Sequence, residues 1–404
     1  MTSSVYMDNH ATTPTDPRVV DVMLPYFTEK FGNPASRQHK YGWVAESAVE
    51  NARNSVARIL RVDSKEVIFT SGATESNNLA IKGIAEAYSS KGKQIITCAT
   101  EHKSVLDVCK HLEKFGYKVT YLPVNEFGLI DLNVLEQAII KETILVSIMI
   151  ANNEIGTLQD VEKIGMICAK KDVIFHTDAT QAVGKIPVDI ESAKIDLLSF
   201  SGHKIYGPKG VGALVVRNRN KKLKLISQID GGGHERGLRS GTLNVPAIIG
   251  LAKALELCND SMDEEQKRLS LLRDKMQNAF LTELDEVYLN GHPTQRLPNN
   301  LNISFMYVED NTLMMSIKEI AVSSGSACST AQPQPSHVLK ALGLNEERRH
   351  SAIRFGLGRF NTEEEVDYVI DRVIQAVKSL REFSPVYKKR VATKQTVSEL
   401  QHPK

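Results

Sequence analysis

The chain has 404 residues, 42% hydrophobic and 24% charged, a length and composition typical of a soluble globular protein with two domains of ordinary size. Its 50 Lys and Arg against 48 Asp and Glu give a net charge of +2, which argues against nucleic acid or a membrane surface as the main partner. No window approaches a membrane-spanning apolar run, and the N-terminus lacks the pattern of a secretory signal. The 5 cysteines are scattered without a Cys-x-x-Cys pair, which suits a reducing compartment, so we expect a cytoplasmic protein.

The first two thirds of the chain alternate between strand-like apolar runs and helical patterns. The predicted elements are strands at 66–70, 94–97, 143–150, 173–176 and 197–200, and helices at 76–87 and 104–115. Such alternation predicts an α/β fold with a largely parallel sheet covered by helices on both faces. Because ligands bind beyond the carboxyl ends of parallel strands, the polar residues that directly follow these runs are the first candidates for a site.

The composition changes near residue 260. The expected elements beyond it are a long helix over 263–284, a strand over 301–305, a mobile loop rich in Gly, Ser and Pro over 323–336, and a C-terminal tail over 385–404 that is basic and weakly structured from 388 onward. We therefore expect a large domain over 16–260 and a smaller domain built from 1–15 and 261–404.

Lys204 follows one apolar run and stands beside a glycine-rich turn, a setting that suits a partly desolvated amine able to form a Schiff base. Asp178 ends another run, and a carboxylate there can keep a pyridine nitrogen protonated. Gln181, three residues later, can hydrogen-bond a phenolic oxygen on the same ring. Taken alone, both residues are better explained without a cofactor, Lys204 as a surface lysine in a turn and Asp178 as a helix N-cap.

Three further segments contain candidate ligands for an anionic aromatic cofactor. The turn at 70–75 joins a strand to a helix N-terminus, which is a typical phosphate site. The glycine-rich and cationic segment 231–242 can approach a phosphate through its backbone and Thr242. His102 follows a strand and can stack on a cofactor ring and shuttle protons. In isolation, a capped turn, a flexible loop and a loop histidine remain open alternatives.

Cys328 is the nucleophile candidate among the cysteines, because it lies in the small-residue loop predicted to be mobile, whereas the other four lie in or beside apolar patterns. Arg354 can pair with a substrate carboxylate as a bidentate fork, and a surface ion pair is its alternative explanation.

Together these residues resemble the cysteine desulfurases (NifS/IscS type) of the class V aminotransferase family. The resemblance runs from Met7 to about Asp367, nearly the whole chain. Its motifs are TSGATESNN at 70–78, ATEHKSV at 99–105, NNEIGT at 152–157, HTDATQ at 176–181, SGHKIYGPKG at 201–210, GGGHERGLRSGT at 231–242 and SSGSACSTA at 323–331. So many ordered matches make the alternative explanations of the single residues the weaker ones.

The resemblance implies a fold-type-I homodimer with a seven-stranded sheet, an active site at the subunit interface and pyridoxal 5'-phosphate bound to Lys204. It implies roles for these residues: Ala73, Thr74, Ser201 and His203 on the phosphate, joined by Thr242 of the partner subunit; Asn153, Asp178 and Gln181 on the ring; His102 stacked on the ring; and Arg354 with Asn153 on the substrate.

The activity implied is conversion of L-cysteine to L-alanine, with Lys204 and His102 moving protons and the sulfur held as a persulfide on Cys328. Acceptors implied are an iron–sulfur scaffold protein and carriers for tRNA thiolation. No resident metal is implied, although Cys328 can transiently share a 2Fe–2S cluster with the scaffold. Residues 385–404 do not match the family's usual C-terminal end, which helps to dock the scaffold in the subgroup that feeds it.

Three other functions remain open from the sequence. Another class V aminotransferase has no need of Cys328, and a selenocysteine lyase would use the same pocket. A non-catalytic binding protein on the same fold is a different class, and it would have no reason to retain Lys204, Asp178, His102 and Cys328 together.

Overall fold

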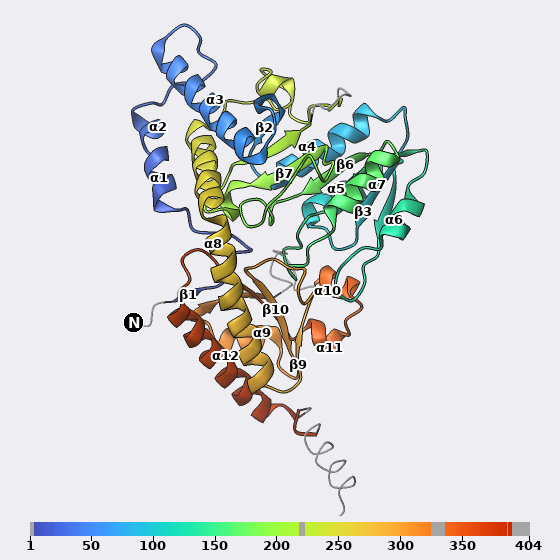
Figure 1. The fold of residues 1–404 in the computed structure, drawn as a ribbon, viewed down its shortest axis with the longest axis vertical. Helices are drawn as coiled ribbons and strands as arrows, with labels where there is room; N and C mark the ends of the chain where they lie inside the picture. The colour runs from blue at the N-terminus through green and yellow to red at the C-terminus, as the bar shows by residue number, and fades with distance from the viewer. Residues whose placement is uncertain (1–3, 218–222, 325–335, 386, 390–404) are drawn as a thin grey trace, which may run out of the picture.

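The computed structural model describes residues 4–217, 223–324, 336–385 and 387–389. Two bodies of secondary structure lie one above the other in Figure 1, and one long helix, α8 (Val245–Glu283), runs from the upper body into the lower. Within these ranges, no helix is both long enough and apolar enough to cross a bilayer.

A seven-stranded sheet forms the centre of the upper body. Its strand order is β2-β8-β7-β6-β5-β3-β4, with β2 (Val67–Thr70), β3 (Gln94–Cys98), β4 (Lys118–Leu122), β5 (Thr143–Ser147), β6 (Ile174–Asp178), β7 (Leu197–Ser201) and β8 (Gly212–Val216). All neighbours pair in parallel except β8, which is antiparallel to both β2 and β7. The prediction of a mainly parallel seven-stranded sheet is confirmed.

Helices cover both faces of this sheet. Neighbouring residues of a strand point to opposite faces, and because apolar residues stand at both, each face needs a cover that buries them. Ile95 packs into an apolar core on one face with α4 (Ala73–Ala87) and α5 (Lys103–Glu113), and Ile96 packs into a second core on the other. The remaining helices and short turns of this body are α1 (Pro17–Met23), α2 (Pro25–Thr28), α3 (Lys40–Leu60), η1 (Ser64–Glu66), α6 (Leu132–Ala138), α7 (Val161–Lys170), η2 (Gly202–Lys204) and η3 (Glu235–Gly237).

The lower body has its own apolar core around a four-stranded sheet of order β12-β13-β10-β9. The elements here are β9 (Val287–Leu289), β10 (Asn300–Phe305), α9 (Asp310–Ser316), β12 (Ser323–Ser324), α10 (His337–Ala341), α11 (Glu346–Arg349), β13 (Ala352–Gly356) and α12 (Glu363–Phe383). The N-terminus joins this body, since β1 (Val5–Tyr6) pairs in parallel with β11 (Ile320–Ala321).

Several predicted boundaries were wrong. The helix expected to begin at 76 begins at Ala73, and the strand expected to run to 150 ends at Ser147. Helix α8 begins at Val245 rather than at 263, because its first half is buried on several sides among residues such as Leu251 and Leu255 and shows no single apolar stripe. The predicted loop begins too early, since Ser323 and Ser324 pair with β13. Residues 325–335, with Cys328, and most of the tail lie outside the described residues.

The division into domains stays a prediction. Along α8 the buried residues belong to the upper core as far as Cys258 and to the lower core from Leu269 onward. The change of core therefore falls inside one continuous helix, and no linker marks it.

Candidate active site

A cavity of about 680 Å³ opens at the carboxyl edge of the large sheet, where β13 of the lower body approaches it. The residues around it include most of those expected from the sequence: Ala73, Thr74, His102, Asn153, Asp178, Gln181, Ser201, His203, Lys204 and Arg354. They come together because β2, β3, β5, β6 and β7 all end at this edge. Thr242 is exposed and does not line the cavity within one chain.

The N-terminus of α4 forms one end of the cavity. Ser71, Gly72 and the first two helical residues line it, and Gly72 carries no side chain that would stand between the helix amides and a ligand. The Ser201 hydroxyl lies 3.7 Å from the place a Gly72 Cβ would occupy, so a second hydroxyl faces the same turn. The amides of a helix N-terminus and the positive end of the helix dipole make this end suited to a phosphate.

Asp178 is held rigidly at the end of β6 and is 5% exposed. One carboxylate oxygen accepts from the Thr180 amide at 2.9 Å, and the other accepts from the Asn77 side chain at 2.8 Å. Asn77 also donates to the Ser104 hydroxyl at 2.9 Å, which ties Asp178 to the start of α5. The sequence reasoning missed Asn77 as an orienting residue, although it stands within the motif at 70–78.

His102 is the N-cap of α5 and a neutral imidazole of defined tautomer. Its Nδ1 accepts from the Ser104 amide at 3.1 Å, so that nitrogen carries no proton and Nε2 does. Burial lowers the pKa of His102, opposed by the charge of Asp178. The ring therefore offers an N–H donor at Nε2 near neutral pH.

Lys204 ends η2, directly after β7, and the N-terminal segment holds it in place. Its ammonium nitrogen donates to the carbonyl oxygens of His10 and Ala11, at 2.6 and 2.5 Å. Next to it, His203 Nδ1 lies 3.1 Å from the Thr12 hydroxyl, and burial with the charge of Lys204 lowers the pKa of His203 to about 4. The segment that carries the amine is thus fastened by a part of the chain far away in sequence.

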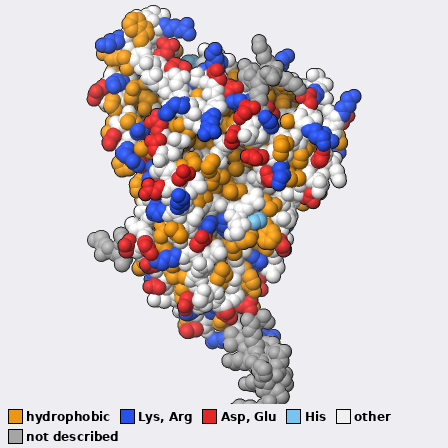
Figure 2. Space-filling view, in the orientation of Figure 1, with side chains coloured by type: hydrophobic (Ala, Val, Ile, Leu, Met, Phe, Trp, Pro, Cys, Tyr) orange, Lys and Arg blue, Asp and Glu red, His pale blue; other side chains and the backbone are white. Residues whose placement is uncertain are grey.

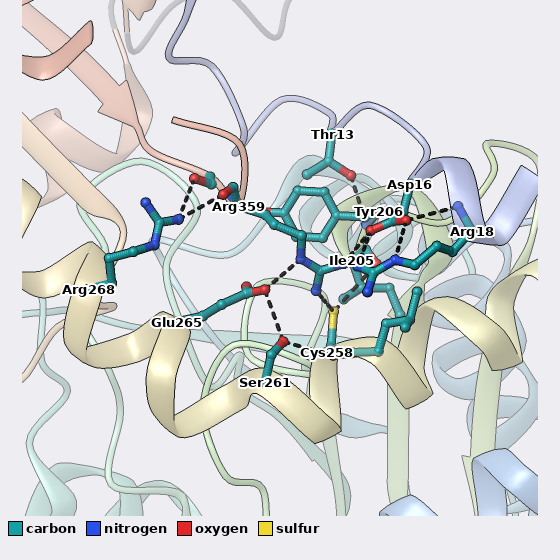
Figure 3. Close-up of polar contacts among 12 residues, drawn as sticks. Thr13, Asp16, Arg18, Ile205, Tyr206, Cys258, Ser261, Glu265, Arg268 and Arg359 are labelled. Carbon is teal, nitrogen blue, oxygen red and sulfur yellow. Dashed lines mark hydrogen bonds and ion pairs between the residues drawn. The ribbon is translucent and has the colours of Figure 1, made fainter. Parts of the chain in front are cut away.

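A second network, drawn in Figure 3, holds the segment that carries Lys204 through contacts with Tyr206. Arg359 ion-pairs with Asp16 at 2.9 Å and with Glu265 of α8 at 2.5 Å. Its guanidinium also lies 4.3 Å from the ring centre of Tyr206, and its backbone amide donates to the Tyr206 hydroxyl at 2.6 Å. Since Tyr206 stands two residues after Lys204, Arg359 links the lower body to the lysine segment.

Arg354 enters the cavity from β13 and is 2% exposed. It donates to the Asn153 carbonyl at 3.0 Å and to Asp8 at 2.8 Å, and its buried Nε makes no hydrogen bond within the described residues. Asp8 also accepts from Ser323, at 2.8 Å, at the start of the segment that leads to Cys328. The structure therefore adds Asp8 as a partner that holds this arginine in position.

His176 lies within β6, between the hydroxyls of Ser147 at 2.8 Å and Ser199 at 3.0 Å, and burial lowers its pKa to about 4. Because the unfolded chain binds this proton near pH 6.5 and the folded chain does so only near pH 4, stability falls as the pH drops through that window. We expect this residue to account for a loss of about 3 kcal/mol.

Urea unfolding of the protein and of a His176→Asn variant at pH 7.5, 6.5, 5.5 and 4.5 measures this effect. The variant should be less stable at pH 7.5 but should lose less stability on acidification. Parallel curves for the two proteins would contradict the expectation.

The donor groups around the cavity fit pyridoxal phosphate. The helix N-terminus with Ser201 suits the phosphate, the fixed carboxylate of Asp178 suits a pyridine nitrogen, and Lys204 offers an amine. Within the described ranges, no group of three or more His, Cys, Asp or Glu side chains is arranged to hold a metal ion.

Known proteins resemble this chain over nearly its whole length. The family model Aminotransferase class-V matches residues 5–369. The chain is 56% identical over 385 residues to "Cysteine desulfurase IscS" of Edwardsiella ictaluri, covering 95% of both chains, and 54% identical over 387 residues to the protein of that name from Rickettsia conorii, covering 96% of this chain and 94% of the relative.

Solved structures show the same likeness. The structure titled "NIFS-LIKE PROTEIN" has a TM-score of 0.87 and 40% identity, and covers 93% of this chain and 99% of its own. "SspA in complex with cysteine" has a TM-score of 0.77 and 36% identity, and covers 89% and 100%. The chain therefore belongs to the aminotransferase class-V family and, within it, to the cysteine desulfurases of NifS and IscS type.

Proposed function

We propose that this protein converts L-cysteine to L-alanine with pyridoxal phosphate and holds the sulfur as a persulfide on Cys328 before passing it on. The observation that carries the proposal is that one cavity brings Lys204, Asp178, His102 and Arg354 together, in a chain whose relatives are named cysteine desulfurases. When bound, the cofactor supplies an electron sink that makes the substrate's α-proton acidic.

Each residue then has a definite task. Arg354 binds the substrate carboxylate, and Asp178 holds a proton on the pyridine nitrogen. Lys204 removes the α-proton at its Nζ, a transfer for which the carbonyls of His10 and Ala11 hold the amine in place. His102, with its proton on Nε2, exchanges protons at the substrate thiol.

The sulfur transfer balances without another reactant. The Cys328 thiolate attacks the substrate sulfur, an S–S bond forms and the C–S bond breaks. The electron pair of that bond stays with the substrate's β-carbon, which takes up a proton and becomes the methyl group of alanine. The products are alanine and the persulfide of Cys328.

The other cysteines support the choice of Cys328. Burial raises the pKa of Cys98, Cys109 and Cys168 to about 12 and that of Cys258 to about 11, so all four stay protonated thiols. A thiol is a poor nucleophile, whereas sulfur transfer needs a thiolate.

Replacing Cys328 by Ser tests the proposal. We expect alanine and sulfide release to fall by at least about 10²-fold, because the nucleophile is missing. Sulfur from labelled cysteine should remain on the protein in the wild type and in the matched control Cys109→Ala, and be absent from Cys328→Ser. Full retention of activity by Cys328→Ser would exclude the persulfide mechanism and favour another class V reaction.

The proposal extends to the partners. A homodimer would explain the apolar side chains that gather on the surface of α1 to α3, at the upper left in Figure 2: Leu24, Phe27, Phe31, Tyr41 and Trp43, each more than half exposed. It would also bring Thr242 of the partner subunit to the phosphate end of the cavity. The acceptors proposed are an iron–sulfur scaffold protein, for cluster assembly, and carriers for tRNA thiolation, in the cytoplasm.

A further inference from the structure

His10 occupies an unusual position in the cavity. It lies on the N-terminal segment, is 1% exposed and lines the cavity. Its Nδ1 is 3.0 Å from Gln181 Oε1, whereas its buried Nε2 makes no hydrogen bond within the described residues. The ring rests on β13, where a Cβ at Gly356 would lie 2.8 Å from His10 Cδ2.

The surrounding hydrogen bonds fix which nitrogen of His10 carries the proton. The His10 carbonyl can only accept, so the Gln181 side-chain nitrogen must face it, at 3.0 Å. The oxygen of that amide then faces Lys185 at 2.7 Å and His10 Nδ1. Because this oxygen can only accept, Nδ1 must donate and carry the proton.

The same surroundings keep the ring neutral. Burial, together with the charges of Lys185, Arg354 and Lys204, lowers the pKa of His10 well below its ordinary value, and the hydrogen bond with Gln181 only partly opposes this. A neutral ring protonated at Nδ1 has a lone pair at Nε2, so that nitrogen can only accept a hydrogen bond. His102 has the opposite tautomer, and the cavity thus holds one imidazole that donates at Nε2 and one that accepts there.

A second buried atom without a partner stands close by in the fold. Arg354 Nε is a donor that makes no hydrogen bond among the described residues. Arg354 and Gly356 are two residues apart on β13, so they share one face of the strand, and His10 lies against Gly356. The cavity therefore offers an unsatisfied acceptor and an unsatisfied donor from neighbouring positions.

An α-amino acid carries the complementary pair, a donating ammonium and an accepting carboxylate on one carbon. We propose that His10 Nε2 accepts a hydrogen bond from the ammonium group of the incoming amino acid, while Arg354 takes its carboxylate. His10 is then a specificity-determining contact that separates amino acids from simple carboxylates. This inference rests on the proposed function for the identity of the amino acid and on the structure for the tautomer.

Nitrogen NMR of the holoenzyme labelled with ¹⁵N-histidine tests the tautomer directly, with the His10 signals assigned by their loss in His10→Gln. We expect a protonated Nδ1 and a bare Nε2. Addition of L-alanine should shift Nε2 toward a hydrogen-bonded value, and propionate, which lacks the ammonium group, should not. A proton on Nε2, a charged ring, or equal shifts with the two ligands would overturn the proposal.

Kinetics supply the second measurement. His10→Phe removes the acceptor and should raise KM for L-cysteine about tenfold, the ratio expected for one lost hydrogen bond, with a smaller change in kcat. His10→Gln, which keeps an acceptor, should recover most of that loss, and unchanged KM in His10→Phe would contradict the contact. A wild-type enzyme without desulfurase activity that still shows the expected NMR shifts would refute the proposed function and leave the role of His10 standing.

Discussion

Replacing Lys204 by Ala should lower desulfurase activity by roughly 10² to 10⁴-fold, the usual contribution of a positioned acid–base group, or more if covalent attachment is also lost. The structure gives the reason, because two backbone carbonyls hold the Lys204 amine at the cavity. The absorbance band expected at about 390–420 nm from the lysine-linked cofactor should disappear.

Lys114→Ala is a suitable control, since Lys114 is exposed at the end of α5 and far from the cavity lining. It should keep both the activity and the band. A Lys204→Ala protein that kept the band and turned over cysteine at the normal rate would show that the amine of another residue binds the cofactor and removes the α-proton.

Replacing Arg359 by Met should destabilise the protein by about 3–5 kcal/mol, the cost of breaking a buried ion pair by removing one partner. Asp16 is 1% exposed and would keep only Arg18, whose side chain is 60% exposed. The variant would also free Tyr206 from the stacked guanidinium, so the lysine segment should lose order. Urea unfolding of the holoenzyme gives the loss of stability.

Arg372→Met is the matched control. Arg372 pairs with Glu319 at 2.8 Å, a similar distance, but both side chains are much more exposed, at 32% and 24%. Such a pair is worth less than about 1 kcal/mol. Equal losses in the two variants would show that burial does not decide the strength of the Arg359 network.

Local patterns were sufficient to predict the sheet and most of the cavity lining. Asp178 and Ser201 are the last residues of β6 and β7. Because the carboxyl ends of parallel strands meet at one edge of a sheet, a correct prediction of the strands also predicted where these two residues lie. The reversed direction of β8 was not predicted, because pairing direction depends on partners rather than on the strand's own residues.

Residues whose importance comes from distant contacts could not be found in this way. His10 and Asp8 stand in a short segment with no strong pattern, and their roles depend on Gln181 and Arg354, which meet them only in the folded chain. The sequence shows that a histidine is present, but only the three-dimensional hydrogen bonds show which of its nitrogens is free to bind.

The sharing of α8 by both cores has a consequence for how the chain assembles. At 39 residues the helix is about 58 Å long, and a rod of that length keeps its two ends in fixed relation. Leu251 packs in the upper core and Met276 in the lower core, and both belong to α8. Neither core is therefore fully packed until this helix has formed. We therefore expect the two bodies to fold together. A substitution that weakens one core should also destabilise the other through the shared helix.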